Sequence, residues 1–367
     1  MQKKEVSISE LFFDLIFVYV LASIAQTVES ISLGILSLEG LGKHLMLFLV
    51  FFAIWVYRTL LVNRYFDKTW YQYLFVFIDM FLIILLSQSI NSNFQETFTP
   101  FVLLSSALFM STAVQYGIVY LKYNDSAVKK LSITYGFGLV LSSVIAIISI
   151  FLDANVNFWV YFVAILTVSV FPLFFTNVSR RQPVYFDHLQ ERLCLFMILL
   201  FGEGIVGVIN NLSEQAISYT NIGHFTIIVL LFVIYGWHYK VGTKDYVETT
   251  GFGICYTHLI LIFSLNMVIL LTGHILHGSH IDSLMSIAIL LSIFVYSLMI
   301  VLDNHIYGHV KMMQPLIGLI LLFVITGFAL FMVGSVNLII SIIMMYIVLN
   351  MALMFYPIKH KILLQYF

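Results

Sequence analysis

Five carboxylates lie inside segments that are otherwise apolar. Glu10 and Asp14 belong to the run Glu-Leu-Phe-Phe-Asp-Leu-Ile-Phe-Val, Asp79 follows Phe-Val-Phe-Ile, and Glu191 and Glu203 belong to one later segment. A charge at the centre of a bilayer costs roughly 2.5–3.5 kcal/mol even on the gentlest scale. If these segments cross a membrane, such acids must be paired, protonated or used in function.

Two permanent bases, Arg58 and Arg192, lie in the same apolar segments. If each arginine pairs with one acid, three of the five acids have no arginine partner. Those three must be exposed to water, protonated, paired with a charged histidine or bound to a cation. Desolvation raises the pKa of a carboxyl group and favours its neutral form. Groups of this kind carry protons in pumps and transporters, so the excess of acid favours a role linked to protons or another cation.

Glu10 has a structural interpretation as well as a functional one. Ser7-Ile-Ser-Glu10 fits a capping box, with Ser7 at the N-cap and Glu10 at the third helical position. Asp14 lies one turn deeper on the same helix face, since residues four apart stack on each other. No cap requires Asp14, so it is the stronger candidate for an ion or proton site.

Asp79 and Glu203 are the deepest acids. The structural alternative for Asp79 is a buried pair with Arg58, and pairing does not exclude function. Glu203 stands between Gly202 and Gly204. Glycines loosen a helix, and interrupted helices line midplane sites in transporters. The structural alternative is a protonated acid bonded to a neighbouring helix, with the glycines serving close packing.

The remaining candidates lie near the expected inner ends of apolar segments. Glu191 and Arg192, with His188 one turn away, suit a local ion pair and helix cap as well as a binding site. His238 and His258 have structural or interfacial roles as their alternative. We count all five with the ion, proton or substrate site.

We expect no catalytic residues, no metal and no cofactor. The sequence has no His-Glu-x-x-His zinc motif and no Gly-x-Ser-x-Gly elbow. His274, His277 and His280 recur every third residue, but Asp282 is the one carboxylate near them. The segment Asn63-Arg-Tyr-Phe-Asp-Lys lacks the glycines of the loop it resembles in major facilitator transporters, so it is interpreted as a solvated loop.

Composition indicates the class of protein. Of the 367 residues, 61% are hydrophobic and 10% are charged, whereas soluble domains are about 25% charged. This predicts an all-α, polytopic membrane protein with no room for a separate soluble domain and no cleaved signal peptide. The formal net charge of −1 argues against a nucleic-acid partner. Cys194 and Cys255 lie in apolar segments, so a disulfide is not expected.

Twelve apolar segments are long enough to cross a hydrocarbon core about 30 Å thick. Their limits are 8–28, 44–63, 71–90, 100–121, 131–152, 156–176, 188–209, 222–241, 253–273, 281–302, 313–333 and 336–356.

Basic residues orient these segments, because positive charge favours the cytoplasmic side. With the N-terminus inside, the inner segments hold Lys3, Lys4, Arg64, Lys68, Lys122, Lys129, Lys130, Arg180, Arg181, Lys240, Lys244, Lys311, Lys359 and Lys361, and the outer loops hold Lys43 alone. The bias predicts a multi-pass protein of the plasma membrane with both termini in the cytoplasm.

The chain also looks duplicated, because the limits of the first six segments recur in the last six at an offset near 180. Glu10 maps to Glu191, and Arg64 maps to Lys244. Six spans per half would give both halves the same orientation, which predicts a 6+6 parallel repeat. We therefore expect one six-helix membrane half at residues 1–180 and a second at 181–367.

At two motifs the sequence resembles the bacterial low temperature requirement A family. The first is Glu10-Leu-Phe-Phe-Asp14-Leu-Ile-Phe-Val. The second is His188-x-x-Glu191-Arg192-x-x-Leu-Phe, followed by Leu-Phe-Gly-Glu203. The resemblance implies a many-span membrane protein over the whole length. Cys194 departs from it, since a glycine is expected there. The family name records a growth phenotype in the cold and implies no particular activity.

Three hypotheses follow. The first is a proton- or cation-coupled secondary transporter of a small solute, with the lipid bilayer as its setting. The second is a membrane sensor or lipid-interacting protein that serves cold adaptation without transport. The third, an intramembrane enzyme, is the least favoured, because the chain carries no catalytic motif. The sequence gives neither the solute nor the oligomeric state.

Overall fold

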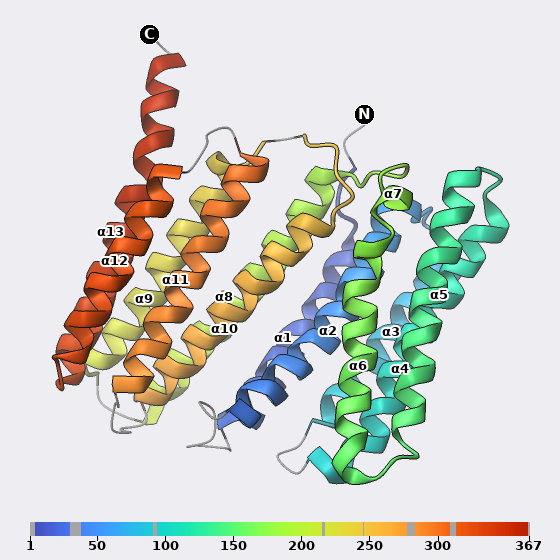
Figure 1. Ribbon diagram of the computed structural model, residues 1–367, viewed down its shortest axis with the longest axis horizontal. Coiled ribbons are helices and arrows are strands. Elements are labelled where there is room, and N and C mark those ends of the chain that lie inside the picture. The colour runs from blue at the N-terminus through green and yellow to red at the C-terminus, as the bar shows by residue number, and fades with distance from the viewer. Residues whose placement is uncertain are drawn as a thin grey trace. The chain divides into compact units, whose positions relative to one another are not determined.

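The chain folds into helices throughout the part that the computed structural model describes, residues 4–29, 38–90, 94–214, 217–244, 246–276, 283–308 and 313–365. The described residues hold no strand, only an isolated bridge between Thr243 and Gly308. The helices are α1 (Ile8–Glu29), α2 (Leu38–Tyr65), α3 (Trp70–Gln88), α4 (Phe94–Lys122), α5 (Ser126–Ser149), α6 (Ala154–Phe174), α7 (Thr176–Ser179), α8 (Phe186–Glu214), α9 (Tyr219–Trp237), the π-helix η1 (His238–Gly242), α10 (Phe252–Leu276), α11 (Ser283–Tyr307), α12 (Met313–Phe331) and α13 (Val336–Gln365) (Figure 1).

Each of the twelve predicted segments overlaps one of the long helices. Among the described residues, eleven helices are long and apolar enough to cross a membrane, from α2 to α6 and from α8 to α13. α1 is not one of the eleven, so the total of twelve spans stays a prediction. The protein is a multi-pass, all-helical membrane protein, as its composition predicts.

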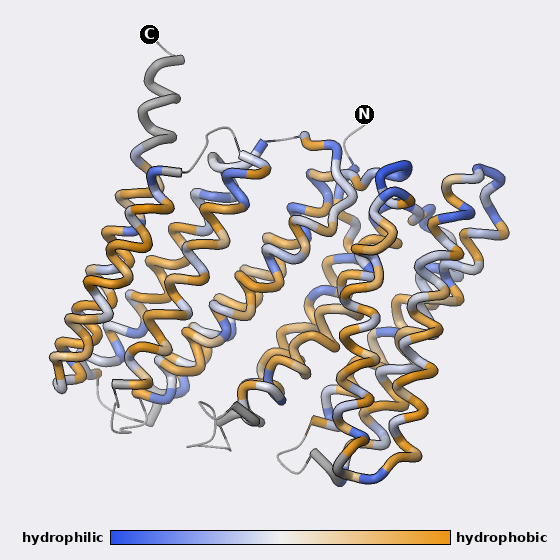
Figure 2. The backbone as a smooth tube through the Cα atoms, in the orientation of Figure 1, coloured by the Kyte–Doolittle hydropathy of each residue, from blue (hydrophilic) through white to orange (hydrophobic). Residues whose placement is uncertain are grey.

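Side-chain burial supports this class. Figure 2 shows hydrophobic residues along the helix bodies, with hydrophilic stretches at many of the ends and connections. α12 leaves large apolar side chains uncovered, including Val324 at 62%, Ile325 at 65% and Phe328 at 68% exposure. Apolar surface on this scale marks a face that contacts lipid or another protein, and not water.

The contacts divide the chain into two compact units. Unit 1 comprises Met1–Phe196 with Glu248–Cys255, and unit 2 comprises Met197–Val247 with Tyr256–Phe367. In unit 1, α4 packs on α5, α5 on α6, and α1 on α2 and α3. In unit 2, α9 packs on α13, and α11 on α12. The units divide within α8 and α10, so the first turns of α8 belong to unit 1.

α2 is the most buried of the candidate spans, with 89% of its most apolar stretch inside the protein. Three of its side chains, Trp55, Arg58 and Asn63, are buried and carry polar groups. Because α2 packs against α1, α4 and α6, these groups face other helices and need partners there. Cys194 and Cys255 are not joined in a disulfide, as expected.

Candidate functional site

The first buried cluster joins α1, α2 and the start of α8 around Asp14. Asp14 and Arg192 are each 1% exposed. The Arg192 guanidinium binds Asp14 through two donors: Nε to Oδ2 at 3.0 Å, and Nη2 to Oδ1. Trp55 Nε1 donates to Oδ1 at 2.8 Å, and its ring lies 5.4 Å from Arg192 Cζ. Two-point binding of this kind is among the strongest side-chain contacts.

Glu10 extends this cluster toward the start of α1. The Ser7 backbone N–H donates to Glu10 Oε2 at 2.9 Å, which is the bond that a capping box requires of its acid. The other oxygen, Oε1, lies 2.9 Å from His188 Nε2 and 3.7 Å from Arg192 Nη1. Glu10 therefore caps its own helix and also joins α1 to α8.

Asn63 on α2 sets the tautomer of His188. Its Nδ2 lies 3.0 Å from His188 Nδ1 and also donates to the Tyr185 carbonyl, while its Oδ1 accepts from the Tyr185 N–H. Since the amide nitrogen donates, His188 Nδ1 accepts, and the ring proton lies on Nε2, facing Glu10. We call Glu10, Asp14, Trp55, His188 and Arg192 the Asp14 cluster.

The second buried cluster joins α2, α3 and α4. Arg58 Nη1 binds Asp79 Oδ2 and also donates to Gln115 Oε1 at 2.7 Å. Ser111 Oγ donates to Asp79 Oδ1, and Gln115 Nε2 donates to Oδ2 at 3.3 Å. The pair expected as the structural alternative for Asp79 is thus present. We call Arg58, Asp79, Ser111 and Gln115 the Asp79 cluster.

An open cavity reaches the Asp79 cluster. Its empty space of about 420 Å³ includes open solvent, and Arg58 and Gln115 form part of its wall. Both are buried, at 2% and 7% exposure. Lys122 and Asp67, which form an ion pair at 2.6 Å, also line it, with about two-fifths of each side chain exposed. The cavity therefore leads from exposed charges at its mouth to a buried guanidinium.

A smaller cavity, whose empty space of about 220 Å³ includes open solvent, lies between the two clusters. Arg58 and Arg192 both line it, together with Glu10, Phe13 and Phe66. Arg58 therefore lines both cavities, and Phe66 does so as well. Asp14 and Asp79 share no ion-pair partner, but their two arginines border one space.

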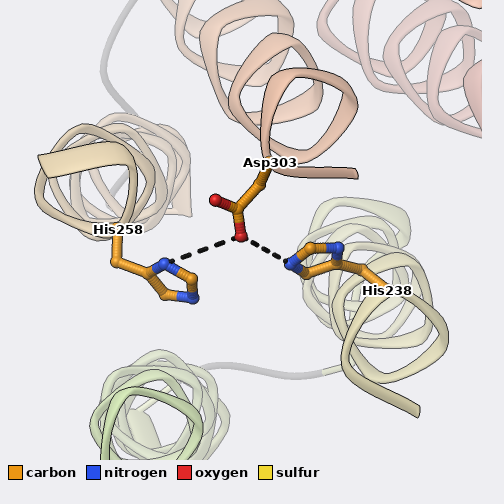
Figure 3. Close-up of side chains that lie close together, drawn as sticks. All are labelled: His238, His258 and Asp303. Atoms are coloured by element: carbon orange, nitrogen blue, oxygen red, sulfur yellow. Dashed lines mark ion pairs between the residues drawn. The ribbon is translucent and has the colours of Figure 1, made fainter. Parts of the chain in front are cut away.

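Three predicted site residues lie in unit 2. His238 and His258 approach the same residue, Asp303 of α11 (Figure 3). Glu203 is half-buried on α8. Glu191 is half-buried too, and within the described part of the chain it forms no ion pair, unlike Glu10, to which the predicted repeat matches it. His274 is described, but His277 and His280 lie outside the described residues.

Sequence reasoning missed Trp55, Gln115 and Asp303. The tally of acids left out Asp303 because the predicted segment ended at residue 302, whereas α11 continues to Tyr307. The polar run Asp303-Asn304-His305 after a long apolar stretch looked like a loop.

The two motifs that carry the family resemblance meet in space. Glu10 and Asp14 come from the first motif, His188 and Arg192 come from the second, and all four belong to the Asp14 cluster. A sequence model described as the bacterial low temperature requirement A protein matches residues 5–350. No curated protein and no solved structure matches this chain.

Proposed function

Because this chain belongs to the bacterial low temperature requirement A family, whose name records a phenotype and no reaction, we propose its activity from its buried charges. We propose that it is a secondary transporter of a small anionic solute, coupled to protons. The observation that carries the proposal is that Arg58, which pairs with the buried Asp79, lines an open cavity.

The physical argument starts from the cost of a buried guanidinium. Removing one partner of a buried ion pair costs about 3–5 kcal/mol, because the other charge is left uncompensated. Arg58 therefore needs an anion at all times. Asp79 supplies one, and a solute carboxylate or phosphate entering the cavity supplies another, since a guanidinium matches both groups.

Exchange of these anions would couple solute to proton. When the solute anion binds the Arg58 guanidinium, Asp79 loses its main counter-ion, although Asp79 stays buried. A buried carboxylate without a cation favours its protonated form. Asp79 then takes up one proton for each negative charge that arrives, and Ser111 and Gln115 remain as hydrogen-bond partners for the neutral acid.

The rest of the cavity supports a small organic anion. Tyr65, Phe66, Tyr71 and Phe75 line it, so an apolar body would have aromatic surface to pack against. Near the mouth, Lys122 is already paired with Asp67, so Arg58 is the cation that an entering anion would meet. The Asp14 cluster holds the second buried arginine beside the smaller cavity, and we assign it to the path beyond Arg58.

Reconstituted protein tests the proposal. Liposomes that hold a pH-sensitive dye are exposed to small carboxylates and phosphates, one at a time. A transported solute is expected to acidify the lumen with wild-type protein. Asp79→Asn should still bind the solute, because Arg58 is kept, but move no protons. Asp153→Asn is the matched control, since Asp153 is exposed and its side chain makes no cap hydrogen bond.

Two results would overturn the transport proposal together: no solute of the panel acidifies the lumen, and Asp79→Asn cells grow in the cold like wild type. Co-purification of one defined lipid under those conditions would favour the alternative, a membrane sensor or lipid-interacting protein without transport. We propose transport and not catalysis, and no cofactor enters the scheme.

The proposal includes a topology: twelve spans, two six-helix halves at 1–180 and 181–367, and both termini in the cytoplasm of the plasma membrane. In a chain with Cys194→Ala and Cys255→Ala, Lys43→Cys should react with an impermeant thiol reagent on intact cells. Lys68→Cys should react only after permeabilisation. Reaction of both from the same side would contradict this topology.

A further inference from the structure

Three ligand atoms from three helical segments converge in unit 2. They are His238 Nε2 at the start of η1, His258 Nδ1 on α10 and Asp303 Oδ2 on α11 (Figure 3). Asp303 Oδ2 lies 3.2 Å from His238 and 3.9 Å from His258, and all three atoms fall within 4.8 Å of one another. None of the three residues is more than 1% exposed.

The hydrogen bond of His238 decides which nitrogen faces Asp303 as an acceptor. His238 Nδ1 lies 2.8 Å from Asn304 Oδ1, an amide oxygen that can only accept. The ring proton of a neutral His238 is therefore on Nδ1, and the lone pair is on Nε2. That lone pair points at a carboxylate oxygen, an unfavourable contact unless a proton or a metal ion lies between them.

The carboxylate of Asp303 is half-satisfied. Its Oδ1 accepts a hydrogen bond from Thr257 Oγ1 at 2.8 Å. Its Oδ2 is buried and has no hydrogen-bond donor among the described residues. Buried acceptors of this kind are rare and need an explanation. The oxygen without a donor is the same atom that both imidazoles approach.

The surrounding backbone fixes this arrangement. Gly308 and Gly242 pack so tightly against Asn304 that a Cβ on either would overlap its atoms. The Lys244 N–H donates to the Tyr307 carbonyl at 3.1 Å. These contacts fix η1 against α11, and they keep the Asn304 side chain within hydrogen-bond distance of His238. Tyr235 Oη lies 3.3 Å from the other nitrogen of His258, so each imidazole has an outer partner, as metal-binding histidines do.

We propose that His238, His258 and Asp303 bind one divalent transition-metal ion of the zinc class. Two imidazoles and a carboxylate suit such ions and disfavour calcium and magnesium, which prefer oxygen ligands. In a tetrahedral site with bonds of 2.0–2.1 Å, ligand atoms lie about 3.3 Å apart. The 3.2 Å spacing already fits. The 3.9 Å spacing must shorten by about half an ångström, and the two imidazole nitrogens, which lie within 4.8 Å of each other, must approach to about 3.3 Å as well. The ion would fasten η1, α10 and α11 to one another, independently of the proposed transport site.

Metal titration of the purified full-length protein tests this proposal. Protein freed of metal by a chelator is titrated with Co²⁺, whose visible absorption reports nitrogen and oxygen ligands in a four-coordinate site, and Zn²⁺ is then added in competition. We expect one ion per chain. His238→Gln and Asp303→Asn should each abolish this binding. His224→Gln is the matched control, a buried histidine on α9 outside the cluster.

A further variant separates metal binding from folding. Asn304→Ala keeps all three ligands and removes only the outer partner of His238, so affinity should fall about 10- to 100-fold. Each variant is checked for a monodisperse elution profile. The proposal is overturned if wild type binds no more Co²⁺ than His238→Gln, or if Asn304→Ala binds as tightly as wild type. In the first case the three residues form a proton-sharing ion pair and not a metal site. In the second, the ion does not bind through a His238 Nε2 that Asn304 orients, as the proposal requires.

Discussion

At the scale of single residues, the membrane part of this protein is organised around two buried arginines. Arg58 and Arg192 are 2% and 1% exposed, and each contacts a carboxylate and an aromatic ring. Asp79 and Asp14 come from different helices than their arginine partners. Each ion pair therefore joins two helices and also neutralises a buried charge. Stability and activity can therefore be separated by experiment.

Removing one member of the Arg58–Asp79 pair should destabilise the protein more than removing both. Arg58→Leu alone leaves Asp79 uncompensated and is expected to cost about 3–5 kcal/mol, whereas Arg58→Leu with Asp79→Leu should fall near wild type. Thermal unfolding in detergent measures this. An equally large loss in the double variant would show that the hydrogen bonds of Ser111 and Gln115 matter more than charge balance.

Trp55→Phe is a milder change at the other pair. It keeps an aromatic ring beside Arg192 and removes the donor to Asp14. Loss of a hydrogen bond to a charged group is expected to cost about 1.5–3 kcal/mol. The same unfolding assay reports it, with Trp70→Phe as the control, since Trp70 is 77% exposed. Equal shifts for both tryptophans would contradict the role of the indole N–H.

Lys4 makes the folding stability of the protein depend on pH. Its ammonium donates to the Val62 and Asn63 carbonyls at 2.6 Å each, and burial lowers the pKa of Lys4 from 10.5 to about 8. Between pH 8 and 10.5 the unfolded chain binds this proton more tightly than the folded protein. Stability contributed by this group therefore rises with pH across that window. Unfolding in detergent should show this rise for wild type and lose it in Lys4→Met. Lys68→Met, at an exposed lysine, should keep it.

At the scale of helices and their ends, the junction of η1 with α11 is the tightest described part of unit 2. A Cβ at Gly308 would overlap the Asn304 carbonyl and lie 2.6 Å from the Gly242 carbonyl, and backbone atoms of this kind have little room to move. π-helices are rare and occur often at functional sites. The π-helix η1 begins at His238, one of the proposed metal ligands.

Gly308→Ala should therefore destabilise unit 2. Overpacking usually costs about 1–3 kcal/mol. Gly236→Ala on α9 is the control, because nothing lies within 4 Å of its added Cβ and alanine favours a helix by about 1 kcal/mol. Opposite shifts of the unfolding temperature are expected. If Gly308→Ala leaves the unfolding temperature unchanged, the junction is looser than the contacts indicate.

The helices could be predicted from sequence, and most of their partners could not. Apolar length is a property of a linear segment, so all twelve segments fall in long helices. The Arg58–Asp79 pair was foreseen as the structural alternative for Asp79, because the two residues lie in neighbouring apolar segments. The Asp14–Arg192 pair joins residues 178 positions apart, and no spacing rule indicates such a contact. Asp303 was missed for a simpler reason, the placement of a helix end.

At the scale of the whole chain, the unit that holds Asp14 includes the first turns of α8, through Phe196. A fragment that stops at residue 180 lacks Arg192 and His188, both of which contact the acids of α1. A fragment that stops at residue 214 contains the complete Asp14 cluster. The longer fragment adds α8, and with it the partners of the α1 carboxylates.

Fragment 1–180 should accumulate poorly in membranes, and Asp14→Asn should rescue it, because an unpaired acid costs roughly 2.5–3.5 kcal/mol in a membrane helix. Fragment 1–214 should gain nothing from the same substitution. Immunoblots of membrane fractions measure both. Asp153→Asn in fragment 1–180 is the control for a general effect of removing an acid. Rescue of both fragments would show that Arg192 does not offset Asp14.

The distance in sequence between Asp14 and Arg192 also has a consequence for biogenesis. A ribosome adds about 5–20 residues per second, so the 178 residues between the two partners take roughly 10–35 seconds to synthesise. During that interval α1 has left the ribosome with its acid and without its guanidinium. The nascent helix must wait at the translocon, at the membrane surface or with its carboxyl protonated, and it enters its final position only when α8 emerges.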